Sequence, residues 1–256
     1  MKDFLGISVR MANWSLLPGY AQCGIEAVEI SLPDKPLTEL IPFARGAAAL
    51  AGESGMQVWS VHLPFSRRLD ISNPDDEGRE NALAELYRTI DLAREVGAGT
   101  LVVHGSSEPN EDSSRPARMA ACAESLSRLQ AYAGEMRLAV ENLPRTCIGR
   151  TGQEVALLSQ SCAGVCFDVN HLLIEDHDAF LDAAGKRVIT THLSDYDGID
   201  ERHWLPGAGV VPFKRVRERL LGMGYDGPFL FELRLGGDGK PYPPEDVVKA
   251  WQKAIS

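Results

Sequence analysis

The sequence predicts an α/β fold, a single (β/α)8 TIM barrel of parallel strands and covering helices. Eight short runs rich in Val, Ile, Leu and Phe alternate with longer segments of helical periodicity, the pattern of repeated strand–helix units around a parallel sheet. The chain has 256 residues, close to the roughly 250 that such a barrel needs. Because no strong internal repeat or linker interrupts it, the simplest division is one domain over residues 1–256.

Most of the expected strands lack strict alternation of apolar and polar residues, as expected when both faces of a strand are covered. They are Leu5–Val9, Ala27–Leu32, Val58–Leu63, Leu101–His104, Leu138–Asn142, Val165–Val169, Val188–Leu193 and Phe229–Leu233. Eight such units favour a closed barrel over an open doubly wound sheet.

Several intervening helices carry start signals. Asn73 and Pro74, followed by three acidic residues, predict an N-cap and a proline at the first helical position. Ser114 and Pro244 open two further helices. The helix expected between residues 10 and 26 has the weakest signals. His177 lies among acidic residues in a helical segment, and we expect it at the surface.

Composition narrows the partners and the compartment. Lys plus Arg number 26 and Asp plus Glu 36, for a net charge of −10, which disfavours nucleic acid although a local basic groove stays open. Five scattered cysteines make a poor disulfide framework and fit a reducing compartment. With no apolar run of membrane-spanning length, we expect a cytoplasmic protein with a small-molecule partner and no membrane partner. The oligomeric state stays open, a homo-oligomer included.

Ionisable side chains end the third to the eighth expected strands. In chain order they are His62, His104, Glu141, Asp168, His192 and Glu232. Buried carboxylates are rare unless paired or coordinated, and the strand ends of a parallel barrel open on one face. A lone histidine could be a hydrogen-bonded core residue, and Asp168 or Asp195 alone could cap a helix. Repetition over six consecutive strands favours a shared polar site.

One divalent ion suits part of this set. Glu141, Asp168, His192 and Glu232 offer oxygen and nitrogen ligands that fit Mn²⁺, Mg²⁺, Co²⁺ or Zn²⁺, and the lack of a thiolate argues against a structural zinc site. Ligand type does not choose among these ions. Two weaker signals are open: Gly207-Ala208-Gly209 is a phosphate cradle or a turn, and Arg67 with Arg68 is an anion site or a solvated loop.

Several motifs together resemble the xylose-isomerase-like barrel superfamily. They are Glu141-Asn142, Phe167-Asp168-Val169-Asn170-His171, His192-Leu193-Ser194-Asp195, Glu232, and His203-Trp204-Leu205-Pro206-Gly207-Ala208-Gly209, which matches a His-x-x-Pro-Gly-x-Gly turn. The resemblance runs from His62 through Glu232. The superfamily includes ketose 3-epimerases, hydroxypyruvate isomerase, inositol-pathway enzymes, dehydratases and apurinic-site endonucleases, so the motifs do not specify one activity.

For an epimerase, the resemblance implies that Glu141, Asp168, His192 and Glu232 hold one metal ion and that Glu141 and Glu232 also move the proton. The expected substrate-binding residues are His62, His104, His171, Arg202 and His203. Epimerases carry an arginine where this chain has His203, and neighbouring Arg202 is the candidate substitute. In the endonucleases the same positions, with His62, His104 and an acid matched here by Glu201, hold three zinc ions.

The favoured hypothesis is a metal-dependent isomerase or epimerase of a small keto sugar or a related hydroxy-carbonyl compound. The metal would act as a Lewis acid, and one of Glu141 and Glu232 would remove the proton α to the carbonyl to give an enediolate. Proton return on the opposite face gives epimerisation, and return to the neighbouring carbon gives isomerisation. The alternatives are a zinc-dependent apurinic-site endonuclease-like phosphodiesterase, and a dehydratase or a non-catalytic barrel of the same superfamily.

Overall fold

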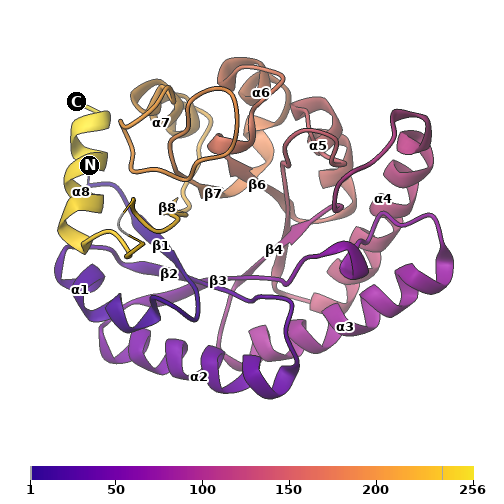
Figure 1. Ribbon diagram of the computed structural model, residues 1–256, viewed down its shortest axis with the longest axis horizontal. Helices are drawn as coiled ribbons and strands as arrows, with labels where there is room; N and C mark the ends of the chain where they lie inside the picture. The colour runs from indigo at the N-terminus through magenta and orange to yellow at the C-terminus, as the bar shows by residue number, and fades with distance from the viewer. Residues whose placement is uncertain (1, 238) are drawn as a thin grey trace.

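The computed structural model describes residues 2–237 and 239–256, which form a barrel of parallel strands inside a ring of helices (Figure 1). The strands are β1 (Leu5–Val9), β2 (Ala27–Ser31), β3 (Gln57–His62), β4 (Thr100–His104), β5 (Arg137–Glu141), β6 (Gly164–Asp168), β7 (Val188–His192) and β8 (Phe229–Phe231). The helices are α1 (Leu17–Gln22), α2 (Leu37–Glu53), α3 (Asp76–Glu95), α4 (Arg115–Ala133), α5 (Gly152–Leu158), α6 (His177–Ala184), α7 (Phe213–Gly222) and α8 (Pro244–Ala254). The expected (β/α)8 fold is confirmed.

From β1 to β7 each strand pairs with its neighbours in the chain, and β8 pairs with β1, in the order β7-β6-β5-β4-β3-β2-β1-β8. The seam between β7 and β8 closes just beyond the end of β7. There the amide of Leu193 donates to the carbonyl of Leu230 at 2.7 Å, and the amide of Glu232 donates to the carbonyl of Leu193 at 3.1 Å. The Thr191 hydroxyl adds a bridge by donating to the Pro228 carbonyl at 3.0 Å. Glu232 is thereby fixed beside the end of β7.

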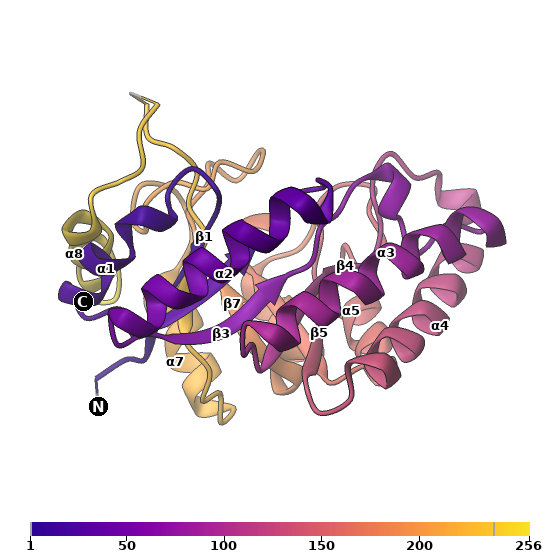
Figure 2. The same ribbon diagram turned by 90° about the horizontal axis from the view of Figure 1, so that it is seen from below.

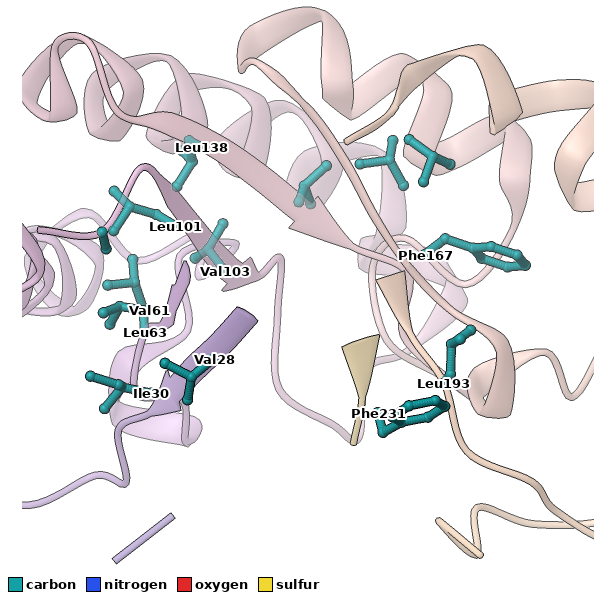
Figure 3. Packing of buried hydrophobic residues seen from close by; sticks show 14 of the residues in the cluster. Val28, Ile30, Val61, Leu63, Leu101, Val103, Leu138, Phe167, Leu193 and Phe231 are labelled. Carbon is teal, nitrogen blue, oxygen red and sulfur yellow. The ribbon is translucent and has the colours of Figure 1, made fainter. Parts of the chain in front are cut away.

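Successive side chains of β4, β5 and β6 face opposite sides of the barrel wall. Leu101, Val103 and Leu138 belong to the large core cluster between the strands and the helices (Figure 3). Alternate positions form a separate small buried cluster of Val102, Ala139 and Cys166. Two residues further along each strand, the same inward face carries His104, Glu141 and Asp168. A polar layer therefore lies on a small apolar layer at the carboxyl ends of these strands.

The start of α3 corrects one expectation. The helix begins at Asp76, and its N-cap is Asp75, whose carboxylate accepts a hydrogen bond from the amide of Gly78 at 2.8 Å. Asn73 lies before the helix and accepts a hydrogen bond from the Asp75 amide at 3.1 Å. The prediction of Asn73 as N-cap with Pro74 in the first turn was wrong, because Asp75 reaches the N-terminal amides instead.

His177 is a second correction. It is the first residue of α6 and is buried, not at the surface. Its Nε2 donates to the carbonyl of Val169 at 3.1 Å, so the ring joins the start of α6 to the segment that follows β6. Of its acidic neighbours, Asp176 caps the helix and Asp178 pairs with Arg215 and Arg219, so their charge did not mark His177 as exposed.

The segment with the weakest signals is also the shortest helix. α1 follows a 3-10 turn at Trp14–Leu16 and has no side-chain cap, in keeping with its weak start signal. It contacts α8, and the two chain ends lie on the same side of the barrel in both views (Figure 2). In the described ranges, no helix combines the length and the apolar character that crossing a membrane requires.

Candidate active site and metal centre

A cavity of about 740 Å³ opens at the carboxyl ends of the strands, within the size range of small-molecule sites. Its charged and imidazole lining residues include Arg10, His104, Glu141, Arg145, His171, Glu201, His203, Glu232 and Arg234. His62, Asp168 and His192 are buried and do not line the cavity. His62 and His192 contact Glu141, which does line it, and Asp168 lies beside His192, so the polar layer of the barrel forms the cavity floor.

Four potential ligands converge at this floor. Glu141, Asp168 and His192 are the last residues of β5, β6 and β7, and Glu232 directly follows β8. One ligand atom from each of the four lies within 4.8 Å of the others. The Nδ1 of His192 is 3.1 Å from Glu141 Oε1, 3.4 Å from Glu232 Oε2 and 4.0 Å from Asp168 Oδ2. The parallel register places Asp168 opposite His192, which explains why these two side chains meet.

Asp168 shows that the group fits a cation. Its Oδ1 accepts a hydrogen bond from the Asn170 amide at 2.7 Å, whereas its buried Oδ2 has no hydrogen-bond partner among the described residues. Asn142 fixes the Asp168 backbone by donating to its carbonyl and accepting from its amide, both at 2.8 Å. Burial raises the pKa of the Asp168 carboxyl to about 6. A buried carboxylate oxygen without a donor is expected where a metal ion supplies the positive charge.

Electrostatics support the same interpretation. Burial acts to raise the pKa of Glu141, but attraction to His192 and His104 holds that pKa well below its usual range. For His192 burial acts in the opposite sense, yet neighbouring anionic groups, among them Glu29 and Glu141, raise its pKa well above its ordinary value. The carboxylates therefore demand positive charge, which histidine protons supply here and a divalent ion of the expected kinds would also supply.

Two histidines hold the second oxygen of Glu141. His62 donates through Nδ1 to the Leu63 carbonyl at 2.8 Å, and its Nε2 lies 3.1 Å from Glu141 Oε2. His104 Nε2 lies 3.2 Å from the same oxygen. Glu141 Oε1 is left facing His192. Of these two histidines, both expected to bind substrate, only His104 lines the cavity, where it stacks on Phe65 with ring centroids 3.8 Å apart.

His171, Glu201 and His203 form a second group beside the first, with one potential ligand atom from each within 4.8 Å of the others. Attraction to Asp168 and the hydrogen bond to Glu201 outweigh burial and raise the pKa of His171 to about 10. Glu201 also forms an ion pair with Arg145 and lies 3.5 Å from Arg234. Arginines therefore already supply positive charge to this second carboxylate.

The His-x-x-Pro-Gly-x-Gly segment wraps around Asp195. Asp195 Oδ2 accepts the amides of Gly207 and Gly209 at 2.9 and 2.8 Å, and Oδ1 accepts those of Tyr196 and Val211 at 3.0 Å each. A Cβ at position 209 would lie 2.0 Å from the Tyr196 carbonyl oxygen, so only glycine fits. The turn interpretation is correct, and these amides bind Asp195 in place of a phosphate. The turn holds the segment that carries His203.

Arg202 is not brought into the cavity. Its Nε donates to Asp197 Oδ2 at 2.8 Å, and the residue is absent from the cavity lining. Arg10, which the sequence analysis did not select, lines the cavity and donates to Glu232 Oε1 at 2.7 Å. Arg67 lines the cavity, whereas Arg68 forms an ion pair with Asp34.

Glu29 was also missed. It lies in the middle of β2, is fully buried, and accepts a hydrogen bond from His192 Nε2 at 3.0 Å. The signal was present in the sequence as a carboxylate inside the apolar run Ala-Val-Glu-Ile. It falls in the middle of the second strand, outside the pattern of ionisable residues that end the third to the eighth strands.

Comparisons with known proteins agree with this architecture. The chain is 26% identical over 249 residues to the L-ribulose-5-phosphate 3-epimerase UlaE of Shigella boydii, covering 90% of this chain and 85% of that one. A Rhodospirillum rubrum structure superposes with a TM-score of 0.83 at 21% identity, covering 98% of this chain and 99% of that one. A D-psicose 3-epimerase structure from Clostridium cellulolyticum, with D-tagatose, gives 0.75 at 18% identity, covering 97% and 96%. The sequence model of the xylose isomerase-like TIM barrel family matches residues 20–255, so the chain belongs to that family.

Proposed function

We propose that this protein is a metal-dependent isomerase or epimerase of a small keto sugar or a related hydroxy-carbonyl compound. The observation that carries the proposal is the buried convergence of Glu141, Asp168, His192 and Glu232 on the cavity floor, with one Asp168 oxygen lacking a hydrogen-bond donor. The similarity to a relative named L-ribulose-5-phosphate 3-epimerase supports the same reaction class. A cytoplasmic location is supported by the five free cysteines, which suit a reducing compartment.

Glu141, Asp168, His192 and Glu232 would hold one divalent ion of Mn, Mg, Co or Zn. When bound, such an ion supplies Lewis acidity toward the carbonyl and the adjacent hydroxyl of the substrate. The remaining chemistry falls to side chains. Arg10 binds Oε1 of Glu232 and leaves Oε2 facing the group, while His62 and His104 bind Oε2 of Glu141 and leave Oε1 facing it.

The two glutamates come from different sides of the barrel, β5 and the end of β8, and both line the cavity. One would take the proton from the carbon next to the carbonyl, and the resulting enediolate would receive a proton from the other on its opposite face. His171 is anchored by its Nδ1 on the Asn142 carbonyl at 2.9 Å, and its Nε2 lies 3.5 Å from Asp168 Oδ2 and from Glu201 Oε2. Because His171 lines the cavity, a substrate oxygen would share this Nε2–H with the carboxylates. Phe65, stacked on His104, gives the cavity wall an apolar ring.

A screen of keto sugars and their phosphates with each of the four ions tests the proposal. At least one substrate should be converted, activity should disappear when a chelator removes the metal, and adding metal should restore it. Unchanged turnover of an accepted ketose after the protein has been stripped of metal would contradict the proposal.

A second candidate is the zinc-dependent phosphodiesterase. The group of His171, Glu201 and His203, together with that of His62, Glu141 and His192, favours it because three adjacent ion sites need such sets. Against it stands the ion pair between Arg145 and Glu201, which supplies the charge that a second ion would bring. The net charge of −10 also opposes binding to a DNA duplex.

A further inference from the structure

Glu29 is a buried carboxylate outside the cavity with a defined partner on each oxygen. It lies in β2, opposite Ser60 of β3, and neither residue has measurable exposure. The Ser60 hydroxyl donates to Oε2 at 2.8 Å, and His192 Nε2 lies 3.0 Å from Oε1. Glu29 is absent from the cavity lining, so it does not contact a molecule bound there. Burying a carboxylate is unfavourable unless its oxygens accept hydrogen bonds. The contacts with Ser60 and His192 meet this requirement, one on each oxygen of Glu29.

His192 lies between this carboxylate and the four-ligand group. Its Nε2 faces Glu29, while its Nδ1 faces Glu141 at 3.1 Å and Glu232 at 3.4 Å. A neutral imidazole carries one N–H and one nitrogen lone pair, and only the nitrogen with the lone pair can bind a metal ion. The tautomer of His192 therefore decides whether a lone pair points into the group.

We infer that Glu29 is a positioning residue that fixes the proton of His192 on Nε2 and so leaves Nδ1 as the metal-binding nitrogen. An ionised carboxylate only accepts hydrogen bonds, so the opposite tautomer would set the Nε2 lone pair against Glu29 Oε1. Ser60 orients the carboxylate by binding its other oxygen. The inference rests on the proposed function because it needs a metal ion at Glu141, Asp168, His192 and Glu232.

Glu29→Gln tests this with little change in shape. A glutamine amide presents either an acceptor or a donor to Nε2, so it no longer selects one tautomer. Losing a carboxylate that orients a metal-binding histidine typically weakens metal affinity by about 10–100-fold. We expect that loss for Zn²⁺ or Co²⁺ in a competition titration with a chromogenic chelator, and a smaller loss for Ser60→Ala.

Asp70→Asn is the matched control. Asp70 is also a buried carboxylate, paired with Arg118 at 3.0 Å and with the Ser72 hydroxyl at 2.6 Å, and it belongs to none of the metal-ligand groups. Its metal affinity should equal that of the wild type. Thermal unfolding measured in the presence of a chelator shows whether each variant folds, and this readout does not depend on activity.

Long-range ¹H–¹⁵N spectra of the zinc-loaded wild type read the tautomer directly, with the His192 signals assigned by their loss in His192→Ala. The expected result is zinc on Nδ1 and hydrogen on Nε2. Zinc on Nε2, or a wild-type affinity in Glu29→Gln, would overturn the role of Glu29 while leaving the metal site in place. If Glu29→Gln does not fold, the wild-type spectrum decides alone. A wild type that takes up no divalent metal would instead overturn the proposed function, and this inference with it.

Discussion

Replacing Asp195 with asparagine should destabilise the protein strongly, because this buried carboxylate accepts four backbone amides. Each oxygen accepts two of them, at 2.8 to 3.0 Å. Asparagine keeps one accepting oxygen, so two of the four amides lose their partner and face an NH2 group. A buried donor without an acceptor costs about 1–3 kcal/mol, which gives a loss of about 2–6 kcal/mol in the free energy of unfolding.

For a chain of this size that loss lowers the Tm by roughly 4–24 °C, at about 2–4 °C per kcal/mol. Urea unfolding followed by circular dichroism measures it. Asp197→Asn is the control, because Asp197 accepts the amides of Ile199 and Asp200 at 2.9 and 3.0 Å on one oxygen, Oδ1, which asparagine keeps. Only the contact of Oδ2 with Arg202 is lost, and water can replace it there. Equal losses for both variants, or a normal Tm for Asp195→Asn, would refute the role given to the buried carboxylate.

Three further predictions follow from other parts of the structure. Purified protein should carry about one divalent ion per chain, and Asp168→Asn or His192→Ala should remove it; equal metal in all three by elemental analysis would contradict the assignment. Burial lowers the pKa of His177 below its ordinary 6.5, so the unfolded chain binds that proton more readily as the pH falls below about 6.5. When the pH falls from 7.5 to 5.5, each about one unit from that value, the wild type should therefore lose more free energy of unfolding than His177→Gln does. Urea midpoints at the two pH values measure both losses, and equal losses would contradict the reasoning. A duplex with an abasic site should not be cut at physiological salt, whereas multiple-turnover incision that His104→Ala abolishes would favour the three-zinc phosphodiesterase.

Strand positions were predictable because the apolar runs are short and bounded. Glu141, Asp168 and His192 are the final residues of their strands, as expected, and Glu232 lies one residue beyond β8. Such side chains could be selected from the sequence because parallel strands of a barrel end on one face. The α3 start was missed because Asn73 and Asp75 are both good caps, and only the folded backbone shows which carboxylate or amide reaches Gly78.

Contacts between residues far apart in the chain could not be predicted from the sequence. Arg10 and Glu232 are joined although 222 positions apart, and His192 meets Glu29 from 163 positions away. Arg202 was selected for its place beside His203, yet local geometry turns it to Asp197. Position along a strand predicts which face a side chain occupies, but the partner of a long side chain depends on which strands become neighbours.

The measurement that tests the two-glutamate mechanism most directly is deuterium exchange in an accepted ketose. Turnover in deuterated water should place deuterium on the carbon next to the carbonyl, because a glutamate removes the proton and exchanges it with solvent. Glu232→Gln keeps a neutral oxygen but cannot accept the proton, so turnover should fall by about 10²-fold or more while part of the metal is retained. Transfer of substrate deuterium to the neighbouring carbon without exchange, or near-normal turnover in Glu232→Gln, would contradict the mechanism.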